Sequence, residues 1–469
     1  MTIPAWVQDA IFYQIFPDRF CNGDPSNDPP GALPWNLCAT PKGFHGGDLA
    51  GITQRLDYLL DLGINALYLN PIFLSPTNHR YNTVDYCRID PKLGTLNDFH
   101  ALIREAHRRG MRVILDGVFN HCGRGFFAFN DILENGSDSP YKDWFHIKRF
   151  PVDAYSAREL KDYEGWWGHK SLPKFNTDNP RVRRYLLDVS RYWIEQGADG
   201  WRLDVPNEID DDHFWAEFRE TVRGINPDAY LVGEIWDALP RWVSPGHFDG
   251  LMNYPFRTAT LGLLGSNWTP ERYATFLSHL VNTYTPEQNA AMYLLLGSHD
   301  VERLRTMLHG ETARVRLAVL MQFAFPGAPA IYYGDEIGLE GGKDPACRGG
   351  FPWDEQYWDM DLRAWFQKLA GLRKSTPVLR QGNFAMQYAS DAAHLVAFSR
   401  RTAAESLLVV ANAKASASEA VIPTQNLGWK DGHLVTNLLD GAQRRVESGR
   451  VQLSLPGWGG AWLYSQAEE

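Results

Sequence analysis

A unit of amphipathic helix, glycine and short apolar strand recurs through the first four-fifths of the 469-residue chain. In the first unit, Gly63 separates a helical pattern from residues 64–70, which have the apolar composition of a buried strand. The helical pattern places four side chains on one face: Ile52, Leu56, Leu59 and Leu60. The recurring unit predicts strands at residues 11–15, 64–70, 112–118, 200–205, 230–235, 248–253, 292–297 and 330–333.

Eight apolar strands with mostly helical connections favour a parallel α/β fold, the (β/α)8 TIM barrel. An open doubly wound sheet would need a topological switch point, and no glycine-rich phosphate loop marks one in this sequence. A barrel is therefore the expected architecture of this part of the chain.

Two departures from the repeat predict further domains. Between His121 and Leu172 the periodicity is lost, and this stretch is too long for an ordinary loop, so we expect a subdomain inserted after the third strand. From about Val378 short alternating patterns at residues 394–399, 406–412 and 451–455 predict a C-terminal antiparallel β-sandwich. The expected division is a barrel at 1–120 and 176–377, an inserted subdomain at 121–175 and a β domain at 378–469.

Charge and cysteine content exclude several classes of partner and location. Lys and Arg total 46 and Asp and Glu 56, a net charge of −10 without a basic block, which argues against nucleic-acid or anionic-membrane binding. The first eight residues lack a signal-peptide pattern, and no apolar run approaches the length of a bilayer span. The five cysteines are scattered and odd in number, so a cytoplasmic location is predicted.

Polar side chains follow four of the predicted strands. In barrels of this type the active site lies at the carboxyl ends of the strands. The side chains at these ends are Asp116, Asn120 and His121 after the third strand, Arg202, Asp204 and Glu208 around the fourth, Glu234 and Trp236 after the fifth, and His299 and Asp300 after the seventh. A single aspartate at a strand end is usually a cap or turn residue, but this concentration of carboxylates beside His, Arg and Asn predicts an active site.

Two carboxylates on neighbouring strands suit the cleavage of a glycosidic bond. One attacks the anomeric carbon while the other protonates the leaving oxygen, and a separation of about 5 Å between them is typical of retention. Asp204 and Glu234 follow adjacent strands of the predicted barrel and fit this pair. Arg202 precedes Asp204 by two residues, so its guanidinium leaves the same face of the strand and favours the ionised carboxylate.

Aromatic residues are unusually numerous, with 17 Trp, 20 Tyr and 24 Phe. A large aromatic core would explain them, and so would a cleft that stacks on the flat apolar faces of sugars. Composition alone leaves both explanations open.

Four segments together resemble the signature segments of the α-amylase family, glycoside hydrolase family 13. They are DGVFNH at 116–121, GWRLDVPNE at 200–208, GEIW at 233–236 and GSHDVER at 297–303. The resemblance implies that Asp204 is the nucleophile and Glu234 the general acid/base. It also implies that Asp300 is a third carboxylate, which holds sugar hydroxyls and stabilises the transition state.

The same resemblance implies roles for side chains around the reacting sugar. His121, Arg202 and His299 match positions that surround this sugar, Tyr81 matches the tyrosine on which it stacks, and His79 lies beside Tyr81. Asp116 is expected to orient the backbone at the barrel end rather than to contact substrate.

Two further positions next to the carboxylates have implied roles. Trp236 follows Glu234 by two residues and is expected to stack on an acceptor-side sugar, with core packing at the barrel rim as the alternative. Val205 follows Asp204, where relatives use the side chain to balance water against sugar acceptors.

Shorter segments resemble the cyclomaltodextrinase, neopullulanase and maltogenic amylase group within the family. LPKFN at 172–176 and VPNE at 205–208 are similar to the MPKLN and VANE segments of that group. GGKDPACRGGFPWD at 341–354 resembles a segment that reaches a neighbouring sugar subsite, which implies substrate-binding roles for Asp344 and Arg348.

The sequence also departs from that group in ways that bear on substrate preference and assembly. The barrel segment begins at Trp6, so the β domain that usually precedes it in the group is not part of this sequence. Asn82, Phe175 and Pro206 replace Asp, Leu and Ala of the group's pattern.

A calcium site is predicted near the amino terminus. Asn22, Asp24, Asn27 and Asp28 supply four oxygen ligands within seven residues, and calcium prefers six to eight oxygens. Relatives with a similar NGDPSND run bind calcium there, which implies that the Gly46 carbonyl and the Asp48 carboxylate join the site. A polar turn held by Asx hydrogen bonds is the alternative. Zinc is not expected, because the histidines lack the usual ligand spacing.

The sequence as a whole predicts a retaining α-glucan hydrolase that acts on small or cyclic maltooligosaccharides. One alternative uses the same residues on α-1,6 bonds, as in a cyclic maltosyl-maltose or pullulan-type sugar, and another is mainly transglycosylation. A catalytically inactive sugar-binding relative would be expected to lose Asp204 or Glu234, and a metal-dependent hydrolase using Asp116, His121, His299 and Asp300 would leave Glu234 and Arg202 unexplained. The expected partner is an oligosaccharide substrate, and a homodimer is left open.

Overall fold

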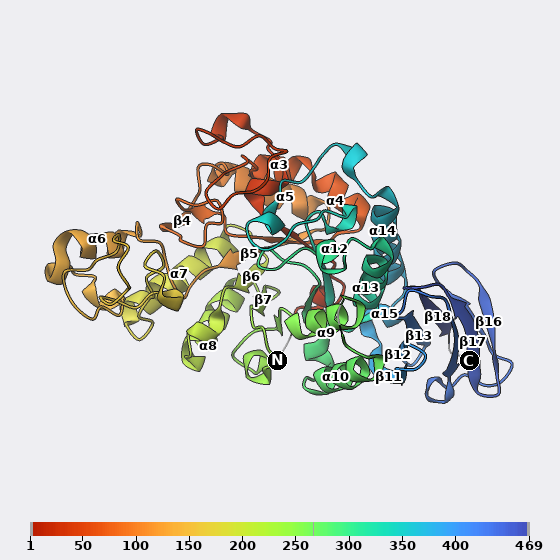
Figure 1. The fold of residues 1–469 in the computed structure, drawn as a ribbon. Helices are drawn as coiled ribbons and strands as arrows, with labels where there is room; N and C mark the ends of the chain where they lie inside the picture. The colour runs from red at the N-terminus through yellow and green to blue at the C-terminus, as the bar shows by residue number, and fades with distance from the viewer. Residues whose placement is uncertain (1–2, 266, 467–469) are drawn as a thin grey trace.

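Eight parallel strands form a closed barrel in the computed structural model, which describes residues 3–265 and 267–466 (Figure 1). The order around the sheet is β8-β7-β6-β5-β2-β1-β10-β9, and a parallel bridge between Met252 and Tyr293 joins its two edges. The strands are β1 (Phe12–Ile15), β2 (Ala66–Leu69), β5 (Arg112–Gly117), β6 (Gly200–Leu203), β7 (Tyr230–Gly233), β8 (Gly250–Leu251), β9 (Tyr293–Leu295) and β10 (Ala328–Tyr332). The predicted barrel and its eight strands are confirmed. The predicted domain limits at residues 1 and 469 lie outside the described residues.

Helices cover the outside of the barrel and bury their apolar faces against it. α5 (Leu96–Arg108) begins at a Thr95–Asp98 capping box and buries Phe99 and Leu102. The other longer helices are α7 (Pro180–Glu195), α8 (Asp212–Ile225), α9 (Tyr254–Gly265), α10 (Pro270–Asn282), α13 (Thr312–Ala324) and α14 (Met360–Ser375). The shorter ones are α1 (Ala5–Gln8), α2 (Pro17–Phe20), α3 (Leu49–Gln54), α4 (Leu56–Leu62), α6 (Phe127–Asn135), α11 (Pro286–Ala290), α12 (Leu304–Met307) and α15 (Val378–Gln381).

One helix of the predicted repeat differs from expectation. The segment that carries Ile52, Leu56 and Leu59 is two short helices, α3 and α4, because the chain leaves helical geometry at Arg55. Leu60 was expected on the buried face, but it is 43% exposed. The buried side chains of α4 are those of Leu56, Leu59 and Leu62, and Leu60 lies about 100° around the helix from Leu59, outside this stripe.

The segment between β5 and α7 is irregular, as predicted, and it projects from the barrel on the side opposite the C-terminal domain (Figure 1). It contains α6 and the 3-10 turns η2 (Gly136–Asp138), η3 (Lys142–Trp144) and η4 (Trp166–Gly168). Bridges from His121 to Lys174 and from Phe145 to Phe175 pair its beginning and middle with its end. Its end is thereby held next to the active-site end of the barrel.

A two-stranded ribbon between β2 and α5 was not predicted from the sequence. It pairs β3 (Phe73–Leu74) with β4 (Asp85–Ile89) in antiparallel fashion. The connection between these strands carries residues 75–84, which include His79 and Tyr81. The ribbon therefore positions a segment that the sequence analysis assigned to substrate binding.

The C-terminal domain is antiparallel, as predicted, with strand order β11-β12-β13-β18-β15-β16-β17-β14. The strands are β11 (Asn383–Ser390), β12 (Leu395–Arg401), β13 (Glu405–Asn412), β14 (Ser418–Pro423), β15 (Leu434–Asn437), β16 (Gln443–Glu447), β17 (Arg450–Leu455) and β18 (Gly460–Gln466). A separate apolar core fills this domain and includes Leu408, Val435 and Leu453.

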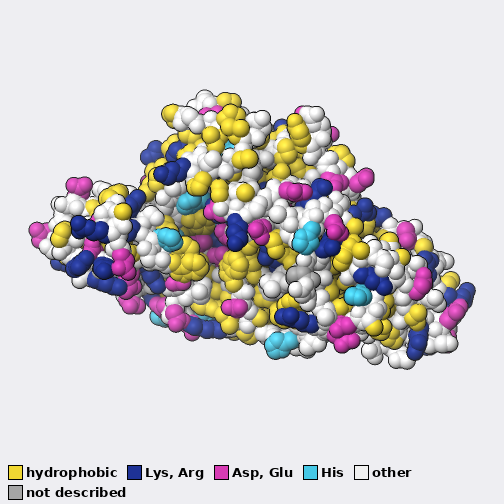
Figure 2. Space-filling view, in the orientation of Figure 1, with side chains coloured by type: hydrophobic (Ala, Val, Ile, Leu, Met, Phe, Trp, Pro, Cys, Tyr) yellow, Lys and Arg dark blue, Asp and Glu magenta, His cyan; other side chains and the backbone are white. Residues whose placement is uncertain are grey.

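The surface mixes charges of both signs. Figure 2 shows Lys and Arg side chains interspersed with Asp and Glu on the face in view, and a hollow beside the inserted segment. No helix within residues 3–265 and 267–466 has the length and apolar character needed to cross a membrane. All five cysteines are free thiols, of which Cys38 and Cys87 are exposed.

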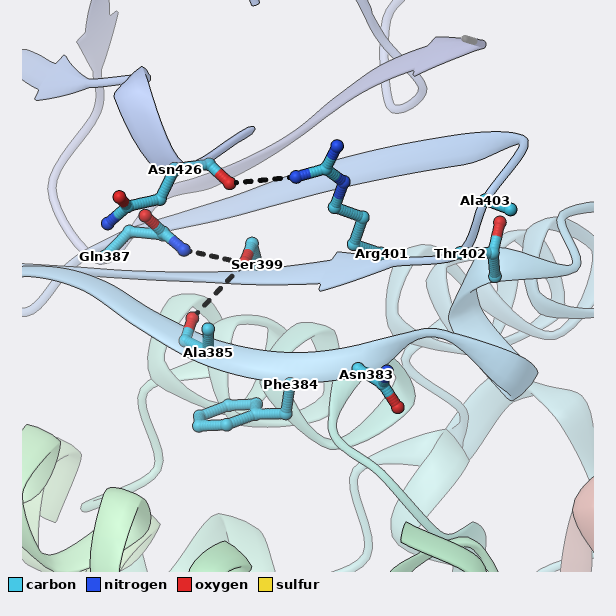
Figure 3. A pocket seen from close by; sticks show the side chains of 9 residues that line it. All are labelled: Asn383, Phe384, Ala385, Gln387, Ser399, Arg401, Thr402, Ala403 and Asn426. Atoms are coloured by element: carbon cyan, nitrogen blue, oxygen red, sulfur yellow. Dashed lines mark hydrogen bonds between the residues drawn. The ribbon is translucent and has the colours of Figure 1, made fainter. Parts of the chain in front are cut away.

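A surface pocket of about 490 Å³ lies on the C-terminal domain (Figure 3). Its polar side chains bond to one another or to nearby backbone: Gln387 donates to Ser399 at 2.8 Å, and Arg401 donates to the Asn426 carbonyl at 3.3 Å. None of the strand-end residues that the sequence analysis singled out lines it.

Gly200 allows β6 to approach β7 closely. Its φ is +154°, and a Cβ atom at this position would lie 2.0 Å from the Tyr230 carbonyl oxygen. We expect Gly200→Ala to lower the free energy of unfolding by about 3 kcal/mol, because the strands would have to separate. Gly224→Ala is the matched control: it lies in α8 with no atom within 4 Å of the added methyl, and should be neutral or stabilise by about 0.5 kcal/mol. Urea denaturation of both variants measures the difference, and equal stabilities would contradict the close approach.

Candidate active site

One buried guanidinium joins carboxylates from three adjacent strands. Arg202, in β6, donates from Nη1 to Asp116 Oδ1 at 2.8 Å and to Asp204 Oδ1 at 2.9 Å. Its Nη2 lies 3.0 Å from Glu234 Oε2 in an ion pair. Asp116 belongs to β5, Asp204 directly follows β6, and Glu234 directly follows β7. The structure therefore brings together the two carboxylates that the sequence pairs.

Glu234 has two more donors. The Val205 backbone N–H donates to Oε2 at 3.1 Å, and the Trp236 indole N–H donates to Oε1 at 3.2 Å. Val205 has φ 36° and ψ 51°, a left-handed conformation that is costly for a β-branched residue. The strained backbone is what turns this N–H toward Glu234, so Val205 contributes its backbone N–H to the site.

Asp116 holds side chains rather than backbone. Its Oδ2 accepts hydrogen bonds from the hydroxyls of Tyr68 at 2.6 Å and Tyr81 at 2.7 Å, while Oδ1 accepts from Arg202. The expectation that Asp116 orients the barrel-end backbone is therefore wrong. The two carboxylate oxygens of Asp116 instead orient the side chains of Arg202 and Tyr81.

Tyr81 stacks on His299 with ring centroids 5.3 Å apart and planes within 5°. Its hydroxyl also accepts from Asn70 Nδ2 at 3.0 Å and lies 2.5 Å from His299 Nε2. The centroid of the His79 ring lies 6.0 Å from that of Tyr81, and His79 Nδ1 accepts from the Tyr81 backbone N–H at 3.1 Å. The unpredicted ribbon thus delivers both residues to the reaction centre.

The three histidines are neutral hydrogen-bonding groups. Burial, followed by the positive charge of Arg348, lowers the pKa of His79 to about 4 and lowers that of His299 well below its usual range. Burial likewise lowers the pKa of His121 to about 3. His121 Nε2 is buried and has no hydrogen-bond partner among the described residues, which suits a sugar hydroxyl.

Asp300 lies at the rim of the cluster with Arg348. Arg348 Nη2 is 3.5 Å from Asp300 Oδ1, its Nη1 is 3.2 Å from Asp344, and its Nε donates to the His299 carbonyl at 2.9 Å. Asp300 Oδ2 is also 3.2 Å from His299 Nε2. The structure therefore gathers the predicted outer-subsite residues around the third carboxylate.

The carboxylates outnumber the cations that face them. Burial and then the charge of Glu234 raise the pKa of Asp300 to about 7. Burial also raises the pKa of Asp204, and the Arg202 guanidinium opposes this rise. Because interacting carboxyls titrate as a unit, the cluster retains a proton in the neutral range. A protonated carboxyl and an ionised carboxylate can therefore coexist in this cluster.

Trp236 stacks face to face on Tyr254, with centroids 3.8 Å apart and planes within 7°. Tyr254 is buried, whereas Trp236 is 48% exposed. Packing at the barrel rim accounts for one face of the Trp236 indole and leaves the other open.

The predicted calcium ligands cluster near the start of α3. Asn22 Nδ2 donates to Asp28 Oδ1 at 2.8 Å, and the Asp48 carboxylate accepts from Asn27 Nδ2 at 3.1 Å. A Cβ atom on Gly46 would lie 2.2 Å from Asp28 Oδ1. The Asp24 carboxylate accepts from the Ser26 hydroxyl and N–H, which is the Asx turn of the alternative interpretation.

The calcium hypothesis fits two buried oxygens of this cluster. Asn22 Oδ1 and Asn27 Oδ1 have no hydrogen-bond partner among the described residues. Burial, together with the charges of Asp48 and Asp24, raises the pKa of Asp28. Amide oxygens without partners are donors of the kind that calcium prefers, whereas the Asp28 and Asp48 carboxylates already accept hydrogen bonds in this structure. Within residues 3–265 and 267–466 no group of three His, Cys, Asp or Glu side chains is placed for metal binding, so the calcium hypothesis depends on the amide and carbonyl oxygens beside Asp28 and Asp48.

Sequence reasoning missed several residues that support the site. Tyr68 and Asn70 lie in or directly after β2 and contact Asp116 and Tyr81, and Gln14, in β1, donates to Asn70 and lies 2.9 Å from His299 Nδ1. The signal was available in the alternation of the strands, because Tyr68 and Asn70 are two residues apart and share a face.

Comparison with known proteins agrees with this geometry. The family described as "Alpha amylase, catalytic domain" matches residues 14–380. The chain belongs to the α-amylase family. It is 43% identical over 461 residues to a cyclomaltodextrinase from Geobacillus thermopakistaniensis, covering 97% of this chain and 77% of that protein. It is 42% identical over 467 residues to neopullulanase 2 from Thermoactinomyces vulgaris, covering 99% and 79%.

A solved structure extends the likeness. The ligand-free cyclic α-maltosyl-(1→6)-maltose hydrolase from Arthrobacter globiformis matches with a TM-score of 0.90 and 40% identity, covering 99% of this chain and all of that one. The family assignment and the glycoside hydrolase class inferred from the signature segments are thereby confirmed.

The raised pKa of Asp300 predicts a pH-dependent effect on stability. The folded chain holds this proton more tightly than the unfolded chain, so the carboxyl favours folding at low pH, and that contribution is lost as pH rises through about 7. Asp300→Asn removes the cost of ionising this carboxyl, whose side chain is 30% exposed, and after solvent screening its stabilisation should be greater at pH 8 than at pH 5 by about 1 kcal/mol. Thermal unfolding at the two pH values measures this. Asp178→Asn, at an exposed position, is the control and should behave alike at both; a pH-independent effect of Asp300→Asn would contradict the raised pKa.

Proposed function

We propose that this chain is a retaining α-glucan hydrolase that acts on small or cyclic maltooligosaccharides. The observation that carries the proposal is the Arg202 guanidinium, which holds Asp204 and Glu234 from adjacent strands in one buried cluster. Two carboxylates held together in this way would serve as the nucleophile and the acid that glycoside cleavage requires.

In the first step Asp204 attacks the anomeric carbon while Glu234 donates its proton to the glycosidic oxygen. The bond to the leaving sugar breaks, and an ester forms between the anomeric carbon and Asp204. Arg202 holds Asp204 Oδ1, so Oδ2 is the attacking oxygen. In the second step the Glu234 carboxylate takes a proton from water, whose oxygen displaces Asp204, and two inversions give net retention.

Side chains around the cluster orient the reacting sugar. The Tyr81 ring, fixed by Asp116 and His299, offers a flat surface for the pyranose ring. His121, His299 and Asp300 supply hydrogen-bonding groups for its hydroxyls. The second step can also take a sugar hydroxyl in place of water, so transglycosylation is the same chemistry with another acceptor. Val205, beside Asp204, is proposed to influence that balance.

The bond that is cleaved is the second part of the proposal. The cyclomaltodextrinase and neopullulanase likenesses favour cyclic and short α-glucans, and the cyclic maltosyl-maltose hydrolase likeness favours the alternative of an α-1,6 bond. The same carboxylates serve either bond, because both present an anomeric carbon and a leaving oxygen. Asp344, Arg348 and Trp236 are proposed to contact the sugars on either side.

A substrate panel tests the proposal. The purified chain is incubated with β-cyclodextrin, pullulan, soluble starch and a cyclic maltosyl-maltose tetrasaccharide, and the products are separated by chromatography. We expect rapid ring opening of cyclodextrin with slow attack on starch, and a loss of at least about 1000-fold in rate for Glu234→Gln. Opening of only the α-1,6-linked ring would move the assignment to the alternative bond, and no hydrolysis of any of the four sugars would refute the function.

We also propose that Asn22, Asn27, Asp28, the Gly46 carbonyl and Asp48 bind a structural calcium ion, with Asp24 at the edge of the site. The unpartnered Asn22 and Asn27 oxygens support this. When bound, calcium would neutralise the Asp28 and Asp48 charges and join residues 22–28 to residues 46–48.

Chelation tests the calcium site. EDTA should lower the melting temperature of the wild-type chain and release calcium, because the two carboxylates would then repel each other. Asn27→Ala should lose most of this response, whereas Asn36→Ala, at a nearby exposed position, should keep it. Bound calcium measured by atomic absorption gives the second readout. Unchanged melting and no bound calcium in the wild type would eliminate the site.

Location and partners complete the proposal. We propose a cytoplasmic enzyme, supported by five free cysteines of which two are exposed. Its partner is an oligosaccharide, and the mixed surface charge in Figure 2 gives no support for nucleic-acid binding. A homodimer stays a prediction, which analytical ultracentrifugation checks.

A further inference from the structure

Three aromatic rings stack in sequence from the active site outward. His121 stacks on Trp166 with centroids 5.4 Å apart, and Trp166 stacks on Trp167 at 4.7 Å with planes within 11°. His121 follows β5, whose Asp116 bonds to Arg202, and this places the inner end of the stack at the active-site end of the barrel. Trp166 stacks on both His121 and Trp167, and the exposed Trp167 is the end of the stack that meets solvent.

Trp167 is 74% exposed, yet it is held in place. Its indole N–H donates to Glu208 Oε1 at 3.2 Å, and Lys174 Nζ lies 3.9 Å from Glu208 Oε2. Glu208 belongs to the 3-10 turn η5 (Pro206–Glu208), which begins two residues after Asp204. The indole is therefore connected to the segment that follows the proposed nucleophile.

The backbone of Trp167 is strained. Its φ of 47° and ψ of 31° lie in the left-handed region, which bulky residues rarely adopt. The turn around it is closed on both sides: the Trp166 N–H donates to the Leu172 carbonyl at 2.9 Å, and Gly165 bridges to Pro173. A strained residue persists where the surrounding structure over-determines it, and such residues concentrate at binding sites.

Core packing explains Trp166 but not Trp167. Burial of a large apolar ring stabilises a protein. The Trp167 ring is instead held in contact with solvent by a hydrogen bond and a left-handed turn. A rigid, flat and exposed indole is the surface on which the apolar face of a pyranose ring stacks, because little conformational entropy is lost on binding.

We propose that the open face of Trp167 is a sugar-binding subsite that stacks on an outlying pyranose ring of an α-glucan. Trp167 is the third ring of the stack that begins at His121. It would therefore contact only substrates that extend beyond the reacting sugar. It is distinct from Trp236, which bonds to Glu234, whereas Trp167 bonds to Glu208. The subsite rests on the proposed function and specifies which substrates that function favours.

Kinetics on short and long substrates test the subsite. For Trp167→Ala we expect kcat/KM on maltoheptaose to fall about tenfold, mainly through KM, and kcat/KM on p-nitrophenyl α-glucoside to change less than twofold, because only the longer chain reaches the indole. Trp167→Phe, which keeps a flat ring, should retain part of the preference for maltoheptaose.

Tyr155→Ala is the matched control. Tyr155 lies in the same inserted segment and is 68% exposed, and its ring packs on the Arg124 guanidinium at 4.3 Å instead of in the stack. This variant should leave both substrates unchanged. Direct binding gives a readout without turnover: in a Glu234→Gln background, calorimetry should show about tenfold weaker maltoheptaose binding when Trp167→Ala is added.

The possible outcomes distinguish failure of the Trp167 subsite from failure of the proposed hydrolase function. Trp167→Ala behaving like Tyr155→Ala would overturn the subsite and leave the proposed function intact. An equal loss on short and long substrates with a lower melting temperature would also overturn it, because Trp167 would then only support the turn. If the wild type hydrolyses no glucan while Glu234→Gln still binds maltoheptaose through Trp167, the function fails and the subsite stands.

Discussion

The ion cluster around Arg202 is the constraint on which the rest of the site depends. A fully buried guanidinium is unfavourable unless carboxylates neutralise it, and Asp116, Asp204 and Glu234 do so from three neighbouring strands. The parallel register places Asp116 beside Arg202, and Leu203 beside Gly233, so the residues that follow β6 and β7 emerge together. The barrel geometry therefore sets the relation between the two proposed catalytic groups.

Strained backbone conformations occur where a group of the site has to point in a particular direction. Val205 and Trp167 both adopt left-handed backbone conformations that disfavour their side chains. The first turns an N–H toward Glu234, and the second presents an indole to solvent while bonded to Glu208. The raised pKa of Asp300 is an electrostatic cost, because partial desolvation within the site and the charge of Glu234 make the ionised carboxylate unfavourable at neutral pH. The favourable contacts of the barrel and its helices offset these unfavourable contributions to the free energy of folding.

Particular residues show how far sequence reasoning reaches. The apolar runs predicted all eight barrel strands, because buried parallel strands have a continuous apolar composition that does not depend on distant partners. Asp204 and Glu234 were identified by their place at strand ends. Leu60 was assigned to the wrong face, because helical periodicity does not report the width of the surface that a helix contacts. The β3–β4 ribbon was missed, since its first strand has only two residues.

The sequence by itself determined the order of the strands, the positions of the carboxylates along them and the family to which the chain belongs. These properties follow from local composition and from short motifs. Only the tertiary structure decided that Asp116 accepts from Tyr68, Tyr81 and Arg202, and that Trp167 is held at the outer end of a stack that begins at His121. Such contacts join residues far apart in the chain, and they depend on the register and curvature of the closed barrel, which no local pattern encodes.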